Sequence, residues 1–196
     1  MAEPVIIVLG LAFGYLLGSI PFGLLFTRFG GKGDIRSIGS GNIGATNVLR
    51  SGSKILALAT LLADVLKGAL AVSLVWRLGS DSAALLAGLA AFVGHLFPVW
   101  LDFKGGKGIA VFIGVILMTS PMTGLVFLTV WLLMALAFRI SSLSAIVALI
   151  VTVPFLMFLG EADTALYTSL MVALSLWAHR ENIARLRAGN EPKIGS

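Results

Sequence analysis

Long apolar runs, separated by short polar segments, make up most of this chain. Runs of about 20 apolar residues are long enough to cross a bilayer. The sequence has such runs near residues 4–27, 55–76, 82–101, 142–159 and 164–178. A further apolar stretch, 109–138, is interrupted near 119–124, where Pro121 and small polar residues favour a break between two helices. The pattern predicts an all-α integral membrane protein with six transmembrane helices, or seven if the break is real.

The distribution of positive charge decides between six and seven. With two helices in the interrupted stretch, 12 of the 14 Lys and Arg residues share one face of the membrane. With one long helix, Arg139 and the basic C-terminal tail would be exported. Because Lys and Arg concentrate in cytoplasmic loops, we predict seven transmembrane helices, with the N-terminus outside and the C-terminus cytoplasmic. The fourth helix, near residues 108–118, is short, with about 11 residues and a length of roughly 16 Å at 1.5 Å per residue.

Composition narrows the class of protein further. Of the 196 residues, 58% are hydrophobic and 12% charged, which is too apolar for a soluble globule. We therefore expect residues 1–196 to form a single polytopic membrane domain. The 14 Lys and Arg against 9 Asp and Glu favour anionic lipids and phosphorylated ligands. No basic helix interleaved with aromatic residues supports nucleic-acid binding.

The residue types also limit the possible chemistry. Cysteine is absent, which excludes disulfides, thiolate metal ligands and a cysteine nucleophile. The two histidines are far apart in the sequence, so no metal site is expected. No cofactor is predicted, and the sequence indicates no particular oligomeric state.

Three polar loops, near residues 29–53, 102–108 and 179–196, share the predicted cytoplasmic face. In the first, Gly39, Gly41 and Gly44 match G-x-G-x-x-G, but no strand precedes them, which excludes a dinucleotide site. Glycines still let backbone N–H groups approach an anion. The candidate phosphate ligands of this loop are Ser40, Gly41, Asn42, Thr46, Asn47 and Arg50. The alternative is an interfacial loop whose glycines form turns and whose arginine contacts lipid head groups.

The second loop places two lysines around a glycine pair at the start of a helix. Lys104, Gly105, Gly106 and Lys107 combine point charges with backbone amides, which favours anion binding. Gly108 stands where a nucleotide-binding P-loop needs Ser or Thr, so that motif is excluded. Simple positive-inside anchoring is the alternative, but it leaves the glycines unexplained.

The third loop contains His179 and Asn182, whose i, i+3 spacing places them on one helix face. An imidazole here could accept a hydroxyl proton, or it could merely cap the helix end. Elsewhere, Asp64 and Lys67 lie one turn apart inside a span, where we expect a structural ion pair. His95 is expected to be hydrogen-bonded inside the bundle.

Segments along nearly the whole chain resemble one enzyme family. These are residues 18–23, 34–36, 39–50, 94–108 and 179–186. In this order they resemble the bacterial acyl-phosphate:glycerol-3-phosphate acyltransferase (PlsY) family. The resemblance implies transfer of a fatty acyl group from acyl phosphate to the sn-1 hydroxyl of glycerol 3-phosphate, giving lysophosphatidic acid and phosphate in the first step of phospholipid synthesis. It also implies a multi-pass protein of the bacterial cytoplasmic membrane, with membrane lipids around it and an active site facing the cytoplasm.

The chemistry implied by the resemblance suggests a role for each of the three loops. Ser40, His179 and Asn182 are the candidate catalytic residues. Lys104 and Lys107, with nearby amides, are expected to bind one phosphate, while Ser40, Arg50 and Asn182 help bind the other. Which loop serves which substrate stays open, as does the choice between His179 as base and a substrate-assisted reaction. The alternative function is a small phosphate or organophosphate transporter. The placement of all three loops on one face of the membrane argues against alternating access, and so against this alternative.

Overall fold

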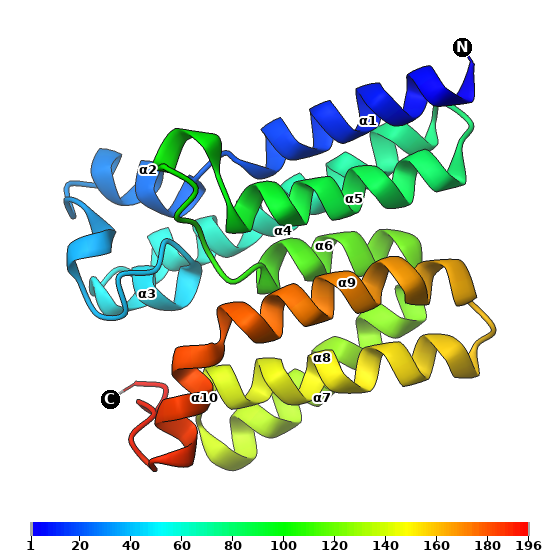
Figure 1. Cartoon of the computed structure of the whole chain (residues 1–196). Helices are drawn as coiled ribbons and strands as arrows, with labels where there is room; N and C mark the ends of the chain where they lie inside the picture. The colour runs from blue at the N-terminus through cyan, green and yellow to red at the C-terminus, as the bar shows by residue number, and fades with distance from the viewer. Residues whose placement is uncertain (1, 196) are drawn as a thin grey trace. The chain divides into compact units, whose positions relative to one another are not determined.

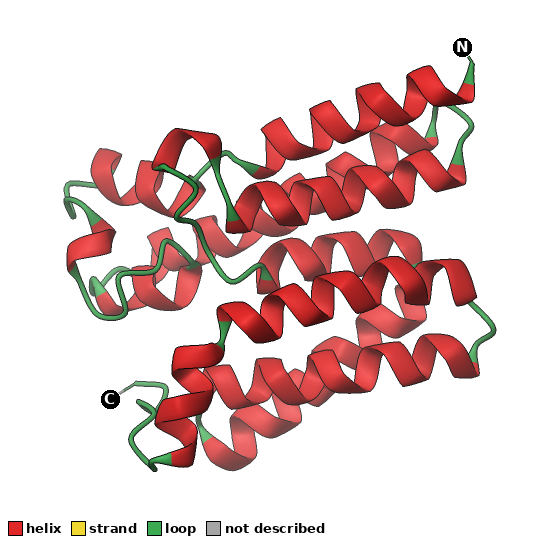
Figure 2. Cartoon of the chain, in the orientation of Figure 1, coloured by secondary structure: helices red, strands yellow, loops and turns green. Residues whose placement is uncertain are grey.

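The structure is a computed structural model that describes residues 2–195, and every regular element in that range is helical (Figures 1 and 2). The chain forms two compact units, one running to Met118 and the other beginning at Thr119. Five helical stretches within the described range are long and apolar enough to cross a membrane. The predicted all-α fold with several apolar helices is therefore confirmed. The single domain stays a prediction.

The first unit contains five helices and most of a sixth. They are α1 (Glu3–Gly18), α2 (Phe22–Phe29), α3 (Ala45–Arg50), α4 (Lys54–Trp76), α5 (Asp81–Leu96) and α6 (Ile109–Thr119), with short 3-10 turns η1 (Ile35–Ser37) and η2 (Val99–Leu101). The short helix predicted near residues 108–118 is therefore α6, which has 11 residues.

Two of the predicted apolar runs are not continuous helices. The first, 4–27, breaks between α1 and α2, and the third, 82–101, ends its α-helix at Leu96. A proline lies at each break. Pro21 immediately precedes α2, and Pro98 lies two residues after the end of α5. Proline lacks an N–H donor and forces the preceding residue out of the helical conformation. The first break is followed by α2 and then the first polar loop, and the second by η2 and then the second polar loop.

Glycines let the helices of the first unit approach closely. A Cβ added to Gly14 or Gly18 of α1 would overlap the backbone of Ala87 or Ala91 in α5. Gly114 of α6 likewise faces the backbone of α4. Small residues at helix contacts bring backbones together in membrane proteins, where packing replaces the hydrophobic effect between helices.

The second unit contains α7 (Pro121–Phe138), α8 (Ser141–Phe158), α9 (Ala162–Ala178) and α10 (Arg180–Arg187). The break predicted in the stretch 109–138 is confirmed, because α6 ends at Thr119 and α7 begins at Pro121. After α10 the chain returns to the turn between α7 and α8, where Ile194 N donates to Arg139 O at 2.6 Å.

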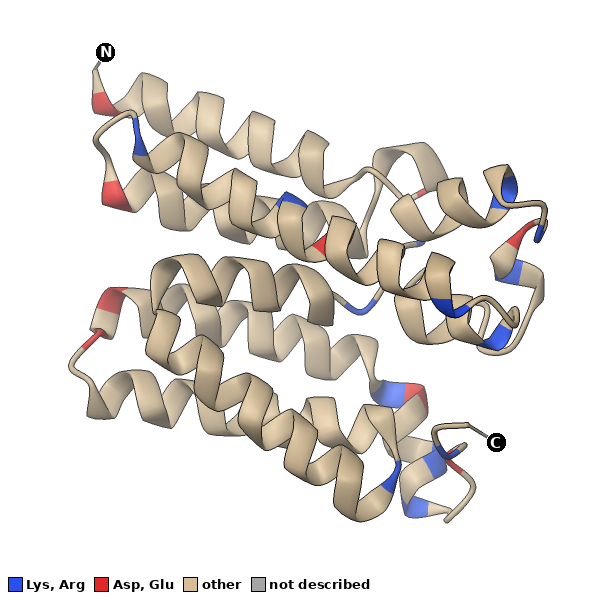
Figure 3. Ribbon diagram, turned by 180° about the vertical axis from the view of Figure 1, so that it is seen from behind, with Lys and Arg blue, Asp and Glu red and all other residues tan. Residues whose placement is uncertain are grey.

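Charge is segregated to the helix ends within each unit (Figure 3). In the first unit, Glu3, Arg77 and Asp81 lie at one end, where Ser80 Oγ donates to Glu3 Oε1 at 3.3 Å. The other basic residues of that unit, apart from Lys67, lie at the opposite end. In the second unit, Glu161 lies between α8 and α9, whereas α10 and its arginines extend from the other end of α9.

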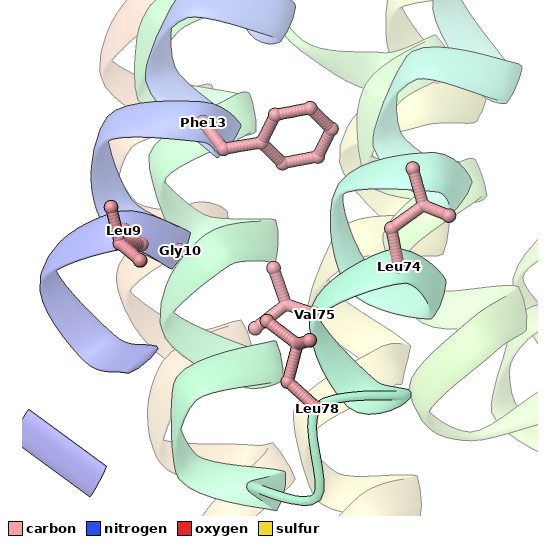
Figure 4. Close-up of a pocket in the computed structure, with 6 residues that line it drawn as sticks. All are labelled: Leu9, Gly10, Phe13, Leu74, Val75 and Leu78. Atoms are coloured by element: carbon pink, nitrogen blue, oxygen red, sulfur yellow. The ribbon is translucent and has the colours of Figure 1, made fainter. Parts of the chain in front are cut away.

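An apolar pocket opens between α1 and α4 (Figure 4). It is lined by Leu9, Gly10, Phe13, Leu74, Val75 and Leu78. These residues lie toward the Glu3 end of the first unit, away from the polar loops. Because no charged or hydrogen-bonding side chain lines the pocket, it offers nothing to bind a phosphate.

Candidate active site

Asn47 organises the first polar loop. Its side chain is only 2% exposed, and its Nδ2 donates to the carbonyl oxygens of Ile35 (3.0 Å), Ile38 (3.0 Å) and Asn42 (2.8 Å). Its Oδ1 accepts the Ser40 N–H at 3.1 Å. The amide donors of Asn47 are therefore already used by the loop backbone. We revise its predicted role from phosphate ligand to the residue that fixes the loop.

Two glycines of this loop require backbone conformations that other residues avoid. Gly39 and Gly41 have φ of +57° and +66°, in the left-handed region that glycine enters without steric cost. Asn42 Oδ1 accepts the Gly44 N–H at 3.0 Å, which leads the chain into α3. The resulting loop leaves three predicted ligands, Ser40, Thr46 and Arg50, exposed at the surface, and Asn42 partly so.

A small apolar cluster supports this loop from beneath. It consists of Leu24, Ile35, Ile43, Val48, Ala57 and Leu101. Because Leu101 belongs to η2, the cluster joins the first loop to the second. Both loops therefore occupy the same end of the first unit.

The charges of the two loops also interact. A side-chain hydrogen bond from Arg36 Nη2 to Asp34 Oδ2, at 2.6 Å, holds the pKa of Asp34 well below its ordinary value. The same contact raises the pKa of Arg36, and Asp102 in the second loop adds to that increase. Charged residues of the two loops are therefore close enough to influence each other.

In the second loop, the glycines pack against the end of α5. Gly105 N donates to Leu96 O and Gly106 N to His95 O, both at 3.0 Å. A Cβ at Gly105 would overlap the His95 carbonyl, and one at Gly106 would overlap the His95 ring. We therefore revise the predicted role of Gly105 and Gly106: their amides bind α5, and they are close-packing positions rather than phosphate ligands.

The lysines of this loop are placed differently from its glycines. Lys104 is exposed and Lys107 partly buried, on either side of the glycine pair and just before α6 begins. Asp102 and Phe103, immediately before them, both have positive φ, at 50° and 59°. This tight turn directs the chain from η2 into the loop.

A buried polar cluster lies where α4 and α5 meet. Lys67 Nζ is 2.8 Å from Asp64 Oδ1, and both side chains are at most 2% exposed, so the predicted internal ion pair is confirmed. Lys67 Nζ is also 3.0 Å from Nδ1 of His95, which confirms a hydrogen-bonded histidine inside the bundle. Sequence analysis did not anticipate that these three residues form one cluster.

In the second unit, His179 lies at the junction of α9 and α10 and is 3% exposed. Its Nδ1 is 2.8 Å from Ser175 O. Since a carbonyl only accepts, Nδ1 carries the proton, and in the neutral ring Nε2 is the basic nitrogen. This geometry includes the predicted helix-end capping.

Asn182 is held by a carboxylate that sequence analysis missed. Glu191 accepts hydrogen bonds from Asn182 Nδ2 (2.5 Å), Ser142 Oγ (2.6 Å) and Arg185 Nε (2.7 Å). Burial raises the pKa of Glu191, but these three hydrogen bonds outweigh it and keep that pKa below its ordinary value. The sequence shows two acids, Glu181 and Glu191, in a basic C-terminal segment, and nothing in it indicates that Glu191 is the partner of Asn182.

No group of three or more His, Cys, Asp or Glu side chains suited to a metal ion occurs within residues 2–195.

Comparison with known proteins identifies the family. Residues 8–189 match the family model described as glycerol-3-phosphate acyltransferase. The chain belongs to this family. A glycerol-3-phosphate acyltransferase of Agrobacterium fabrum is 55% identical over 192 residues, covering 98% of this chain and 94% of that protein. Another, from Rhodopseudomonas palustris (strain BisB5), is 55% identical over 190 residues and covers 97% of both chains.

Solved structures agree with this membership. The crystal structure of PlsY (YgiH), an integral membrane glycerol 3-phosphate acyltransferase, in its glycerol 3-phosphate form has a TM-score of 0.92 and 37% identity, over 96% of each chain. Its lysophosphatidic acid form has a TM-score of 0.89 and 36% identity. This member of the glycerol-3-phosphate acyltransferase family is accordingly an integral membrane protein, and the predicted resemblance to the PlsY family is confirmed.

Proposed function

We propose that this membrane enzyme transfers a fatty acyl group from acyl phosphate to the sn-1 hydroxyl of glycerol 3-phosphate, giving lysophosphatidic acid and inorganic phosphate. Family membership supports the acceptor, and the two PlsY forms are named for glycerol 3-phosphate and lysophosphatidic acid. The observation that carries the choice of donor is the joining of two basic, glycine-containing loops by Leu101 at one end of the first unit. Two phosphate-sized charges need two such loops, and an acyl phosphate supplies the second charge.

The proposed topology has seven membrane spans, with α6 as the short one and α9 as the last. Each unit gathers most of its basic residues at one end, and positive-inside bias places these ends in the cytoplasm. The N-terminus is then outside, the C-terminus is cytoplasmic, and the active site faces the cytoplasm from the bacterial inner membrane. The acyl chain stays in the lipid while both phosphates are held at the surface.

The polar groups divide into phosphate ligands and positioning groups. Lys104 and Lys107 bind one phosphate as point charges. Arg50 offers a planar fork to two oxygens of the other, with Ser40 and Asn182 as further donors. Thr46, which is exposed, and Asn42, which is partly exposed, add neutral donors in the same loop. Charge held in this way is preorganised for the transition state.

The reaction itself needs one bond made and one broken. The sn-1 oxygen attacks the acyl carbonyl carbon, and the bond from that carbon to the phosphate oxygen breaks, releasing inorganic phosphate. The hydroxyl proton passes either to Nε2 of His179 or to an oxygen of the acyl phosphate. Because phosphate is a good leaving group, orientation and charge stabilisation can supply most of the acceleration.

Replacing His179 by Ala separates the two proton routes. If Nε2 is the base, kcat falls by about 100-fold or more, within the range for general-base catalysis, and the pH profile of kcat loses its lower limb. If a substrate oxygen takes the proton, turnover persists with an unchanged profile.

Replacing Lys104 and Lys107 together by Ala tests the phosphate assignment. The apparent KM for one of the two substrates should rise by about tenfold or more, since each charge-assisted contact contributes about 1.5–3 kcal/mol. Lys32→Ala with Lys54→Ala is the matched control, because both are exposed lysines at the same end of the unit but outside the predicted ligand set. An unchanged KM for both substrates would refute the assignment.

A further inference from the structure

Lys67 is surrounded by three hydrogen-bond acceptors. Its Nζ lies 2.8 Å from Ile20 O, 2.8 Å from Asp64 Oδ1 and 3.0 Å from His95 Nδ1. The carbonyl and the carboxylate can only accept. An ammonium group has three N–H donors and no acceptor, so Lys67 donates to Ile20 O and His95 Nδ1 and forms an ion pair with Asp64.

These contacts fix the state of the His95 ring. Because Lys67 donates to Nδ1, the proton of the neutral imidazole lies on Nε2. The Nε2 edge faces the second loop so closely that a Cβ on Gly106 would overlap it. In addition, the backbone oxygen of His95 accepts the Gly106 N–H at 3.0 Å. His95 therefore contacts Lys67 with one side of its ring and Gly106 with the other.

The cluster also reaches the chain break before the first loop. Ile20, whose carbonyl Lys67 binds, lies between α1 and α2 and next to Pro21. Its oxygen accepts hydrogen bonds from the Phe22 N–H at 3.1 Å and from Lys67 Nζ at 2.8 Å. One ammonium thus connects α4, the break after α1, and the end of α5 that carries the second loop.

We propose that Lys67 is a positioning residue for the loop of residues 104–108. By orienting His95, it fixes Gly106 and so the backbone that carries Lys104 and Lys107. The importance of those two lysines for phosphate binding rests on the proposed function, whereas the link from Lys67 to the loop rests on the contacts alone.

Stability alone does not explain a buried Lys at this position. Replacing a buried ion pair by apolar residues of similar size is often neutral or stabilising. An apolar side chain would fill the space of Lys67 but would give no hydrogen bond to Ile20 O or His95 Nδ1. The ion pair with Asp64 balances the charge, and the other two donors of Lys67 orient the loop.

The test is Lys67→Met combined with Asp64→Asn, which leaves no unpaired charge in the membrane. Hydrogen exchange in the peptide spanning residues 104–108 should become about tenfold faster, because exchange reports local opening. The KM for the substrate that Lys104→Ala affects should rise by about tenfold, with kcat changed less than about threefold, the signature of lost binding. Arg77→Met is the control, since it removes an exposed cation from the other end of α4; it should change neither readout.

A second pair of variants covers failure of the double variant to fold. His95→Asn keeps an acceptor near the position of Nδ1, whereas His95→Leu has none. Exchange in the 104–108 peptide should be faster in His95→Leu than in His95→Asn. Adding Lys104→Ala to His95→Leu should give less than the summed effect on KM, because coupled sites are not additive.

The outcomes separate this inference from the proposed function. Loop exchange unchanged in folded Lys67 or His95 variants, or fully additive KM effects, would overturn the role of Lys67. Faster loop exchange in a protein whose wild type transfers no acyl group would overturn the proposed function and leave the positioning role intact.

Discussion

The two glycine-rich loops of the first unit are alike in composition but differ in how they are held. In the loop of residues 39–50, glycines supply left-handed backbone and Asn47 supplies the hydrogen bonds. In the loop of residues 104–108, Gly105 and Gly106 are needed for space, because they pack against the end of α5.

The difference shows that glycine content does not define one kind of loop structure. The amides predicted as anion ligands at Gly105 and Gly106 are bound to α5, and the exposed groups next to them are side chains. The backbone amides of the first loop are bound within that loop and those of Gly105 and Gly106 are bound to α5, while exposed cations or hydroxyls lie beside them. The two loops therefore should respond differently to the same kind of substitution.

The largest effect is expected for Gly105→Ala. Its Cβ would meet the carbonyl oxygens of His95 and Leu96, so the backbone itself must move. We expect kcat/KM to fall by about 100-fold, or ~2.7 kcal/mol. Gly160→Ala is the control, since Gly160 has a positive φ (+77°), which disfavours any side chain, but has no neighbour within 4 Å. Equal activity losses in the two variants would show that space is not the issue at Gly105.

Asn47→Ala should have the next largest effect, on stability as well as activity. The substitution removes the hydrogen-bond partner of the Ser40 N–H and a donor to three carbonyl oxygens. Buried unsatisfied groups cost about 1–3 kcal/mol each. Because water reaches part of this loop, we expect a loss of about 2–4 kcal/mol in total, measured by thermal unfolding in detergent. Asn47→Asp, which retains only the acceptor, should lose nearly as much; full stability in Asn47→Asp would mean that the three donor contacts contribute little.

At Gly41 the requirement should be conformational. Its φ is +66°, and an added Cβ would meet only Arg36 O, at 3.2 Å. Asn enters the left-handed region more readily than β-branched residues do. Gly41→Asn should therefore be more stable than Gly41→Val by about 1 kcal/mol in thermal unfolding. At Gly105 we expect Asn and Val to be equally destabilising, because the limit there is space. Equal stability of the Asn and Val variants at Gly41 would contradict a conformational requirement at that position.

The smallest effect is expected in the second unit, where a carboxylate rather than a glycine organises the polar residues. Hydrogen bonds from Ser142, Asn182 and Arg185 outweigh burial and lower the pKa of Glu191 from its ordinary 4.5. A lowered pKa stabilises the fold above the unfolded value, and this stabilisation is lost as the pH falls through the folded value. Glu191→Gln should lower Tm by about 2–4 °C near neutral pH. The difference from wild type should shrink below pH ~4; a gap independent of pH would contradict the carboxylate's role.

Features set by local pattern were predictable from the sequence. The break at residue 120, the short α6 and the pairing of Asp64 with Lys67 follow from proline, length and i, i+3 spacing. The positions of the polar loops were also predictable, because each polar loop lies between two apolar runs of the sequence. The family resemblance added the expected chemistry to these loops.

Features that depend on distant contacts were not predictable. The amides of Gly105 and Gly106 bind the carbonyl oxygens of Leu96 and His95, at the end of α5. Pro98 and η2 separate the glycines from these partners in the sequence, and nothing in the glycine pattern indicates them. Glu191 binds Asn182 only because the tail folds back. The seven-span topology and the roles of Ser40, Arg50 and His179 stay predictions.

The most direct test of the proposed function is the choice of acyl donor. Purified protein would be given labelled glycerol 3-phosphate with palmitoyl phosphate, and in a parallel reaction with palmitoyl-CoA. We predict labelled lysophosphatidic acid from palmitoyl phosphate, with one inorganic phosphate released per product, and none from palmitoyl-CoA. Product from palmitoyl-CoA alone would contradict the proposed mechanism, because the reacting acyl group would then be a thioester with no phosphate on its carbonyl carbon.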